Sequence, residues 1–418
     1  MGTDSGQRPV RFGVLGASRG THLAGIAQSA GMELVAICDK WEKRAKESGE
    51  RLGVPYYVDY DKFLERDDME AVMVANFCHE HAPASIKALE AGKHVISETI
   101  ACKTLAEGVA LTRAVENSGK IYMLAENYAY FAYVQEMRRL YKAGEIGEFQ
   151  YGEGEYNHPM SALEMNTLGP GVLHWRNRRP PTYYPSHAMS PLMHITDTRP
   201  VSVNAQSVPR SEKDEENLHV RVGDEGAVML CRMSNGAMVR LMALSMRGHS
   251  IWYRLHGTRG LMENLRTGDT GMLRVTHEPW DRREGDVAEK IYKPDFPHHA
   301  DVARSAGHGG GDFFVCHHFA EAVRKNEQPY LDVYRGVDMA LIGMQAWRSC
   351  LENGAPHEIP DFRDESVRKK YENDDWSPFP EDRRPGQPWP SILGDLKPSK
   401  EALAYARQVW EEMGFEGE

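Results

Sequence analysis

The sequence lacks several features that mark specialised classes of protein. Its six cysteines are scattered, with no CxxC pair and no framework spacing, which favours a reduced protein. No apolar run approaches the length of a membrane span, and the opening Met-Gly-Thr-Asp-Ser-Gly-Gln-Arg-Pro has no apolar centre like that of a signal peptide. Basic residues number 50 against 61 acidic ones, and the net charge of −11 argues against nucleic-acid binding. We therefore expect a cytoplasmic protein with neither nucleic acid nor membrane as a partner.

The 418 residues exceed what one hydrophobic core usually supports, so we expect more than one domain. In the first part of the chain, apolar strand patterns alternate with helical patterns, which predicts a doubly wound parallel sheet with ligands at the carboxyl ends of its strands. The expected strands are 10–15, 31–39, 71–77, 94–97 and 121–124. One expected helix begins near Arg19 or Gly20, and the others span 41–53, 81–91 and 105–117. An α/β Rossmann domain is the prediction for residues 1–130.

The apolar pattern changes its period from about residue 148. Five segments read as strands, and Ser234-Asn235-Gly236 supplies a hairpin turn, so one antiparallel sheet is expected. These segments are 149–156, 201–208, 228–233, 238–246 and 251–257, with helices at 134–142 and 313–325. The prediction is a mostly antiparallel, open-sheet α+β domain over residues 131–360 for substrate binding and oligomerisation. Residues 361–418 should form a strap that ends in a helix at 400–413.

The stretch 10–39 is the clearest site pattern in the chain. Gly16 ends an apolar strand, where a side chain would keep phosphate oxygens away from the backbone N–H groups of the turn. The next helix directs its free N–H groups at that anion. Asp39 ends the following strand, where a carboxylate binds the adenosine ribose and repels a 2′-phosphate. The pattern predicts NAD rather than NADP, although Ser18 and Thr21 stand where glycines are usual.

Several motifs outside this stretch resemble the Gfo/Idh/MocA oxidoreductases over nearly the whole chain. They are His81 with its helix, Ala-Leu-Glu-Ala-Gly-Lys-His-Val-Ile-Ser-Glu at 88–98, and His-Gly-Thr-Arg-Gly-Leu-Met-Glu-Asn at 256–264. The family usually continues Glu-Lys-Pro, with a lysine for proton transfer, but this chain reads Glu98-Thr99-Ile100. Threonine does not titrate near neutral pH, so the ordinary dehydrogenase mechanism is in doubt.

A second set of motifs is similar to the NAD-dependent glycosidases of glycoside hydrolase family 109. The most specific are Tyr183-Tyr184-Pro185-Ser186-His187 and Gly307-His308-Gly309-Gly310; they are supported by Asp312, Glu126-Asn127, His174-Trp175-Arg176 and Pro360-Asp361-Phe362. This resemblance implies a closed redox cycle. The sugar is oxidised at C3 by NAD⁺, loses its C2 proton and its leaving group, adds water at C1 and is reduced again, so that the net reaction is hydrolysis.

The resemblance also implies the site residues. His187 is the first candidate for the base at the C3 hydroxyl, because imidazole titrates near neutral pH. Tyr184, with a depressed pKa, could move the C2 proton, although burial alone would raise that pKa. Glu98 could orient a sugar hydroxyl or the histidine, Tyr128 should face the same cleft, and His308 is a candidate substrate contact or acid. The expected cofactor contacts are Gly16, Ser18, Arg19, Gly20, Asp39, Asn76, His81, Glu98, Asn127, Trp175 and Arg176.

Each of these features also has a structural interpretation. His187 could serve only as a hydrogen-bonded structural group, and Glu98 only as a turn cap. Packing is the preferred role of Tyr183. His79, His81 and His317-His318 could suggest a metal, but their spacing and the lack of a matching carboxylate set argue against one. The arginines of 174–179 could bind a carboxylate, sulfonate or phosphate on the sugar, or could lie in a solvated loop or subunit contact. A largely apolar open sheet face would predict a homodimer or homotetramer.

Three functions remain open from the sequence. The first is the glycosidase. The second is a sugar or cyclitol dehydrogenase that releases NADH, with His187 in place of the missing lysine. The third is a sensor or scaffold that binds NAD without turnover, in which replacement of His187 would be silent.

Overall fold

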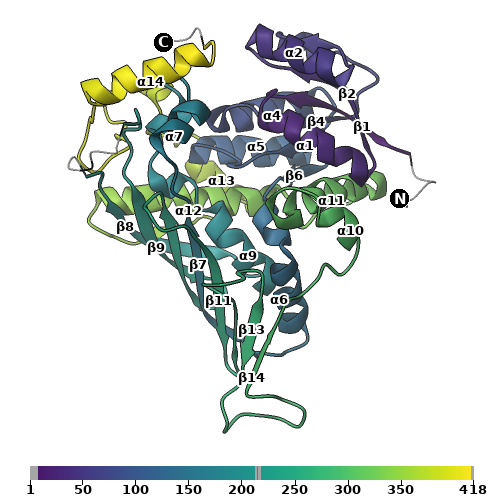
Figure 1. Cartoon of the computed structure of the whole chain (residues 1–418), viewed down its shortest axis with the longest axis vertical. Coiled ribbons are helices and arrows are strands. Elements are labelled where there is room, and N and C mark those ends of the chain that lie inside the picture. Colours follow the sequence, from purple (N-terminus) through teal and green to yellow (C-terminus); the bar gives the residue numbers. More distant parts are fainter. Residues whose placement is uncertain (1–7, 212–213, 215–217, 416–418) are drawn as a thin grey trace.

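Six short strands form a parallel sheet near the amino terminus in the computed structural model, which describes residues 8–211, 214 and 218–415 (Figure 1). They are β1 (Val10–Leu15), β2 (Met32–Cys38), β3 (Tyr56–Tyr57), β4 (Ala71–Val74), β5 (His94–Ser97) and β6 (Tyr122–Leu124). Their order is β3-β2-β1-β4-β5-β6, and every neighbouring pair is parallel. The predicted doubly wound sheet is confirmed, and its order reverses beside β1, where such sheets bind ligands.

Helices cover this sheet because its strands are apolar on both faces. All four residues of β4 are buried, as are most of β1 and β2. The covering helices include α1 (Arg19–Ala27), α2 (Glu42–Leu52), α3 (Tyr60–Leu64), α4 (His81–Glu90) and α5 (Leu105–Ser118). Gly20 lets α1 approach the sheet, because a Cβ at this position would lie 2.4 Å from Val14 Cγ1. The strand ends of this domain are therefore held rigidly beneath the turn after β1.

Nine strands form the second sheet, in the order β14-β13-β12-β11-β7-β10-β9-β8-β15. They are β7 (Phe149–Asn157), β8 (Pro200–Val208), β9 (Gly226–Met233), β10 (Met238–Leu244), β11 (Ser250–Gly257), β12 (Leu261–Asn264), β13 (Leu273–Thr276), β14 (Glu289–Tyr292) and β15 (His357–Glu358). The mostly antiparallel sheet is confirmed with one correction. Its pair β7 and β10 is parallel: β8, β9 and β10 follow one another as antiparallel neighbours, and β10 then lies beside β7 in the same direction.

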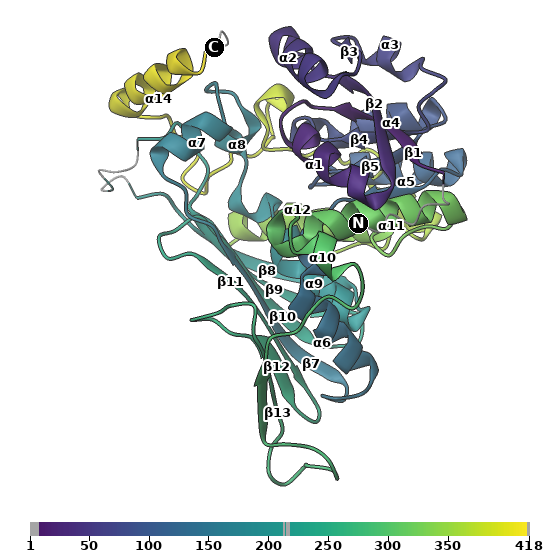
Figure 2. The ribbon, with the colours of Figure 1, turned by 45° about the vertical axis from the view of Figure 1, so that its right-hand side comes forward.

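One face of the second sheet packs against helices, and the other face is open (Figure 2). The covering helices are α6 (Ala132–Lys142), α9 (Ser186–Thr196) and α12 (Val333–Leu351). On the open face Arg240 of β10 pairs with Glu153 of β7, and Glu263 lies 2.8 Å from Arg274. The face is therefore not simply apolar, and the homodimer or homotetramer stays a prediction, which light scattering would test.

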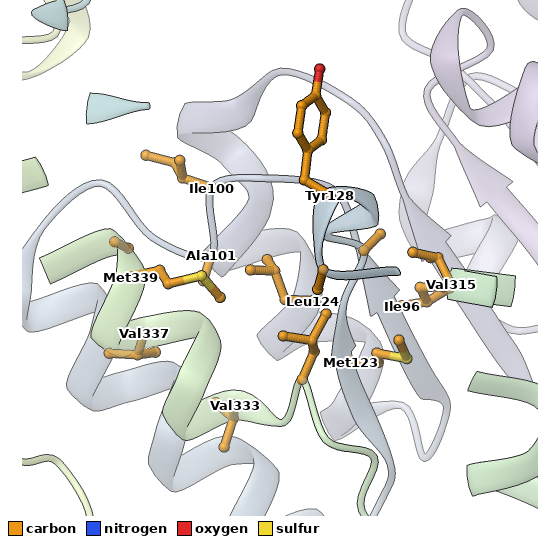
Figure 3. Close-up of a cluster of buried hydrophobic side chains, with 14 of the residues drawn as sticks. Ile96, Ile100, Ala101, Met123, Leu124, Tyr128, Val315, Val333, Val337 and Met339 are labelled. Atoms are coloured by element: carbon orange, nitrogen blue, oxygen red, sulfur yellow. The ribbon is translucent and has the colours of Figure 1, made fainter. Parts of the chain in front are cut away.

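The helix α12 holds the two sheets together, because it contacts β6 of the first sheet and β8 of the second (Figure 1). α11 (Gly311–Lys325) packs against α1 of the first domain. Figure 3 shows side chains from β5, β6, α11 and α12 in one cluster, with Tyr128 directed away from it. Neither α9 nor α12 was among the expected helices. α12 is buried over most of its length and lacks a polar face, and α9 contains Pro191.

The C-terminal segment crosses both parts of the molecule. α13 (Glu365–Tyr371) packs on α5, and α14 (Lys400–Glu412) packs on α7 (Ala162–Leu168). The Trp410 indole N–H donates to the carbonyl of Asn166 at 2.9 Å. All six cysteines are buried and unpaired. No helix among the described residues has the length and apolarity to cross a membrane; the opening residues 1–7 lie outside the described part.

Candidate active site

A cavity of about 730 Å³ lies over the carboxyl ends of β1, β2 and β4. The expected cofactor contacts that line it are Gly16, Ser18, Arg19, Asp39, Asn76, Trp175 and Arg176, and Phe415 joins them, whereas Gly20, His81, Glu98 and Asn127 do not line it. Gly16 has a φ of 99°, and a Cβ there would lie 2.3 Å from the carbonyl oxygen of Ala75. The turn after β1 therefore requires glycine, which leaves its backbone open to an anion.

The polar groups of this cavity fit a nicotinamide dinucleotide. Asp39 accepts hydrogen bonds from the backbone N–H groups of Ala17 at 2.7 Å and Trp41 at 2.8 Å, which fix the carboxylate at the end of β2. Each carboxylate oxygen can still accept a ribose hydroxyl. The side-chain carbonyl oxygen of Asn76, which lines this cavity, is buried without a protein partner, as is that of Asn127, which lines the adjoining cavity. Such orphaned acceptors match the hydroxyl and carboxamide donors of the cofactor.

A second cavity of about 560 Å³ adjoins the first and shares Arg19, Asn76, Trp175 and Arg176 with it. Every predicted catalytic residue lines it, namely Glu98, Tyr128, Tyr184, His187 and His308. The elements that supply them lie far apart in sequence: the end of β5, the segment after β6, the start of α9 and the loop before α11. The structure therefore brings the predicted catalytic set together at one cavity beside the nucleotide site.

His187 is held by a carboxylate that the sequence marked only as supportive. Its Nδ1 lies 2.9 Å from both oxygens of Glu126, whose side chain is fully buried. A carboxylate only accepts, so Nδ1 carries the hydrogen and Nε2 keeps its lone pair for the cavity. Burial alone would raise the pKa of Glu126, but the His187 imidazole and hydrogen bonds hold it below its usual value. One expectation was that Glu98 orients His187, but the carboxylate that contacts His187 belongs to Glu126.

Aromatic rings fix the plane of the His187 imidazole. Tyr128 stacks on it at a centroid distance of 4.1 Å, and Tyr184 and Tyr156 meet it edge-on at 4.8 and 4.9 Å. Burial raises the pKa of Tyr184, so the expectation of a depressed pKa is wrong. Its phenol oxygen accepts from the hydroxyl of Thr99, the residue in place of the family lysine, at 3.2 Å. Tyr184 is therefore a protonated donor near neutral pH. Tyr156 of β7 was missed, because an alternating strand residue looks like any packed aromatic.

Asp312 joins the two domains at the edge of the site. Its buried carboxylate accepts two hydrogen bonds from Arg19, at 2.6 and 3.1 Å, and one from the Asn127 amide at 2.8 Å. His308 Nδ1 lies 2.9 Å from the same carboxylate, so His308 forms a second histidine–carboxylate pair. Burial would raise the pKa of Asp312, but the hydrogen bonds from His308 and Arg19 hold it well below its usual range.

Replacement of Asp312 by asparagine should destabilise the protein in a pH-dependent way. The pKa of Asp312 is lower in the folded protein than in the unfolded chain, where it is near 4. The stabilisation that the ionised Asp312 gives the fold is therefore complete above about pH 5 and declines as the pH falls below that unfolded-state pKa. At pH 7 we expect Asp312→Asn to lower the free energy of unfolding by about 3 kcal/mol. At pH 3 the difference from wild type should narrow by about 1 kcal/mol. Denaturant titrations measure both.

The control for this prediction is Asp269→Asn. Asp269 forms an exposed ion pair with Lys293 at 2.9 Å, so its replacement should change the free energy of unfolding far less than that of Asp312 at either pH. If Asp312→Asn lowered the free energy of unfolding equally at pH 7 and pH 3, that result would contradict the lowered pKa assigned to Asp312.

The remaining predicted residues take supporting positions. Glu98 accepts from Arg19 Nε at 2.8 Å and from the backbone N–H of Thr99 at 3.3 Å. His81 is buried at the second cavity, with Nδ1 2.9 Å from the carbonyl of Ile100 and Nε2 3.3 Å from that of Asn76. It therefore fixes the two strand-end segments. Tyr183 is a buried packing aromatic, as expected.

A histidine cluster lies outside both cavities. His298, His299 and His317 place one ring nitrogen each within 4.8 Å of one another, a spacing that a transition-metal ion could bridge. His298 and His299 are exposed, and none of the three lines the cavities. His79 and His81 do not join this cluster.

Two family profiles divide the chain between them. Residues 10–126 match the oxidoreductase family with an NAD-binding Rossmann fold. Residues 130–369 match the C-terminal domain of glycosyl hydrolase 109. The chain belongs to glycosyl hydrolase family 109. This membership confirms the predicted resemblance and makes the protein an enzyme of the Gfo/Idh/MocA type with an NAD-binding domain.

Curated members of family 109 match most of the chain at low identity. A family 109 protein of Solibacter usitatus is 24% identical over 84% of this chain and 88% of its own length. One of Stenotrophomonas maltophilia is 26% identical over 85% and 89%. Among solved structures, levoglucosan dehydrogenase with NADH and levoglucosan has a TM-score of 0.68 at 21% identity, covering 84% of this chain and all of that one. An inositol dehydrogenase homologue from Azotobacter vinelandii with NAD+ has a TM-score of 0.68 at 20% identity, covering 84% and 97%. These structures establish a shared fold.

Proposed function

We propose that this family 109 enzyme is an NAD-dependent glycosidase that oxidises its sugar transiently at C3. Elimination across C1 and C2, addition of water and reduction at C3 then complete a hydrolysis without net oxidation. The observation that carries the proposal is the His187–Glu126 pair, which places an oriented imidazole at the cavity beside the nucleotide site. That imidazole stands in for the lysine that Thr99 replaces.

Each proton of the cycle has a candidate group in the second cavity. His187 Nε2 takes the proton of the C3 hydroxyl and returns it at the last step. Bound NAD supplies the reversible acceptance of hydride from C3. His308, oriented by Asp312, is the candidate for the C2 proton, and the protonated Tyr184 can donate to the leaving oxygen. Tyr128 holds the plane of His187, and because burial raises its pKa it does not serve as a base.

We also propose NAD rather than NADP as the cofactor and the cytoplasm as the compartment. Asp39 at the first cavity supports the cofactor preference, because its carboxylate would repel a 2′-phosphate. Six buried, unpaired cysteines support a reducing compartment.

Hydrolysis in D₂O tests the cycle directly. Elimination removes the C2 hydrogen and water addition replaces it from solvent, so we expect one deuterium at C2 of each released sugar. Mass spectrometry and NMR of products from a panel of aryl glycosides measure the label. Unlabelled sugar would exclude the elimination, and NADH released well beyond one per enzyme would instead establish the dehydrogenase. Bound NAD without turnover on the panel would favour the sensor.

A further inference from the structure

The wall of the second cavity carries arginines with few acidic partners. Arg179 and Arg221 line this cavity but not the nucleotide cavity, whereas Arg176 lines both. The one carboxylate among the lining residues is Glu98, and Arg19 already pairs with it. The wall therefore presents guanidinium groups to whatever fills the substrate space.

Arg179 is the least compensated of these groups. Its Nε is buried without a hydrogen-bond partner, and among the described residues no carboxylate lies within ion-pair distance of its guanidinium. Burial and then repulsion from Arg221 lower its pKa to about 10. A buried cation without a counter-ion is costly unless a partner compensates it.

The structure holds this guanidinium in place from several sides. It lies 4.7 Å from the ring centroid of Tyr184 and 5.9 Å from that of Trp175. Stacking covers its faces and leaves the N–H edges for hydrogen bonds. The backbone of Arg179 packs so closely on Gly223 that a Cβ there would lie 2.3 Å from the Arg179 carbonyl oxygen. The surrounding residues therefore fix the position of the Arg179 side chain.

Arg221 extends the same surface from a different segment of the chain. It donates to Ser245 Oγ at 2.8 Å and to the backbone carbonyl of Asp224 at 2.6 Å, while its Nε stays buried without a partner. Burial lowers its pKa, although Glu225 and Asp224 oppose that change. His158 and His249 line the same cavity.

We propose that Arg179 and Arg221 form a subsite for an anionic group on the sugar, a carboxylate, sulfate ester or phosphate ester. The inference rests on the proposed function for its sugar ligand and names the class of that sugar. Guanidinium edges bind the oxygens of all three groups with paired hydrogen bonds. Because neither residue lines the nucleotide cavity, the cofactor's pyrophosphate does not account for their charge.

Binding to the NAD-loaded enzyme tests the subsite without requiring turnover. The probes are glucuronate, glucose 6-sulfate and glucose 6-phosphate against glucose, and the corresponding galactose series against galactose. We expect at least one charged member to bind tenfold or more tightly than its neutral partner by calorimetry. Arg179→Gln should remove that preference, and Arg221→Gln should weaken it.

Arg178→Gln is the matched control. Arg178 neighbours Arg179 but donates to the carbonyl of Val172 at 3.0 Å and does not line the second cavity, so its replacement should leave the preference intact. Three results would overturn the subsite: no charged sugar preferred in either series, an equal effect of Arg179→Gln on neutral and charged sugars, or inorganic sulfate or phosphate binding as tightly as the charged sugars. Charged-sugar binding without deuterium at C2 would refute the cycle and leave the subsite standing.

Discussion

His187→Ala should lower kcat of the NAD-loaded enzyme by about 10³-fold, the usual contribution of a positioned general base. The imidazole is oriented by Glu126, with Tyr128 stacked on its face and Tyr184 meeting it edge-on. Affinity for NAD should stay within about twofold of wild type, because His187 does not line the nucleotide cavity. Single-turnover rates and NAD titration measure the two effects separately.

Two further variants separate catalysis from packing at this position. His187→Gln keeps most of the volume between the tyrosines and should be as inactive as the alanine variant. Glu126→Gln should cost about 10²-fold, because its amide N–H can favour the wrong imidazole tautomer. His256→Ala, on β11 and outside both cavities, is the control and should retain full activity. Retention of activity within threefold by His187→Gln would end its role as the base.

The sequence was most informative where local pattern decides structure. The strand at 10–15 and the helix start at Arg19 agree with β1 and α1, because a short apolar run beside a glycine turn and an amphipathic helix have few alternatives. α12 was missed because a helix buried almost all round shows no periodic contrast. The parallel pair β7 and β10 depends on chain connection, which periodicity does not carry.

The site residues show the same difference between what local sequence pattern predicts and what depends on tertiary structure. Motifs pointed to His187 and His308, but the pairing of His187 with Glu126, 61 positions away in sequence, appeared only in the fold. Asp312 lies four positions after His308, yet its contact with Arg19 spans 293 positions. Burial, which raises the pKa of Tyr184, likewise follows from the elements packed around it. Pattern thus pointed to the proposed catalytic groups, and tertiary structure showed which groups contact them.

Gly16→Ala should raise the dissociation constant for NAD at least 100-fold, or about 2.7 kcal/mol. The added Cβ would lie 2.3 Å from the carbonyl oxygen of Ala75, and the φ of 99° is unfavourable for alanine. Both effects move the turn whose N–H groups face the cofactor's phosphates, so the rise in Tm that NAD gives the wild type should disappear. Calorimetry and thermal unfolding with and without NAD measure these effects.

The matched control for Gly16→Ala is Gly25→Ala in the same strand–helix unit. Gly25 lies within α1, and a Cβ there would meet no atom within 4 Å, so the variant should bind NAD as wild type does. Alanine should also stabilise that helix by up to about 1 kcal/mol. The Tm of each variant without NAD separates a local effect on the turn from general unfolding. Wild-type NAD affinity in a folded Gly16→Ala protein would contradict the placement of the cofactor over the end of β1. The proposed cycle depends on that placement, because it puts the nucleotide next to the cavity that His187 lines.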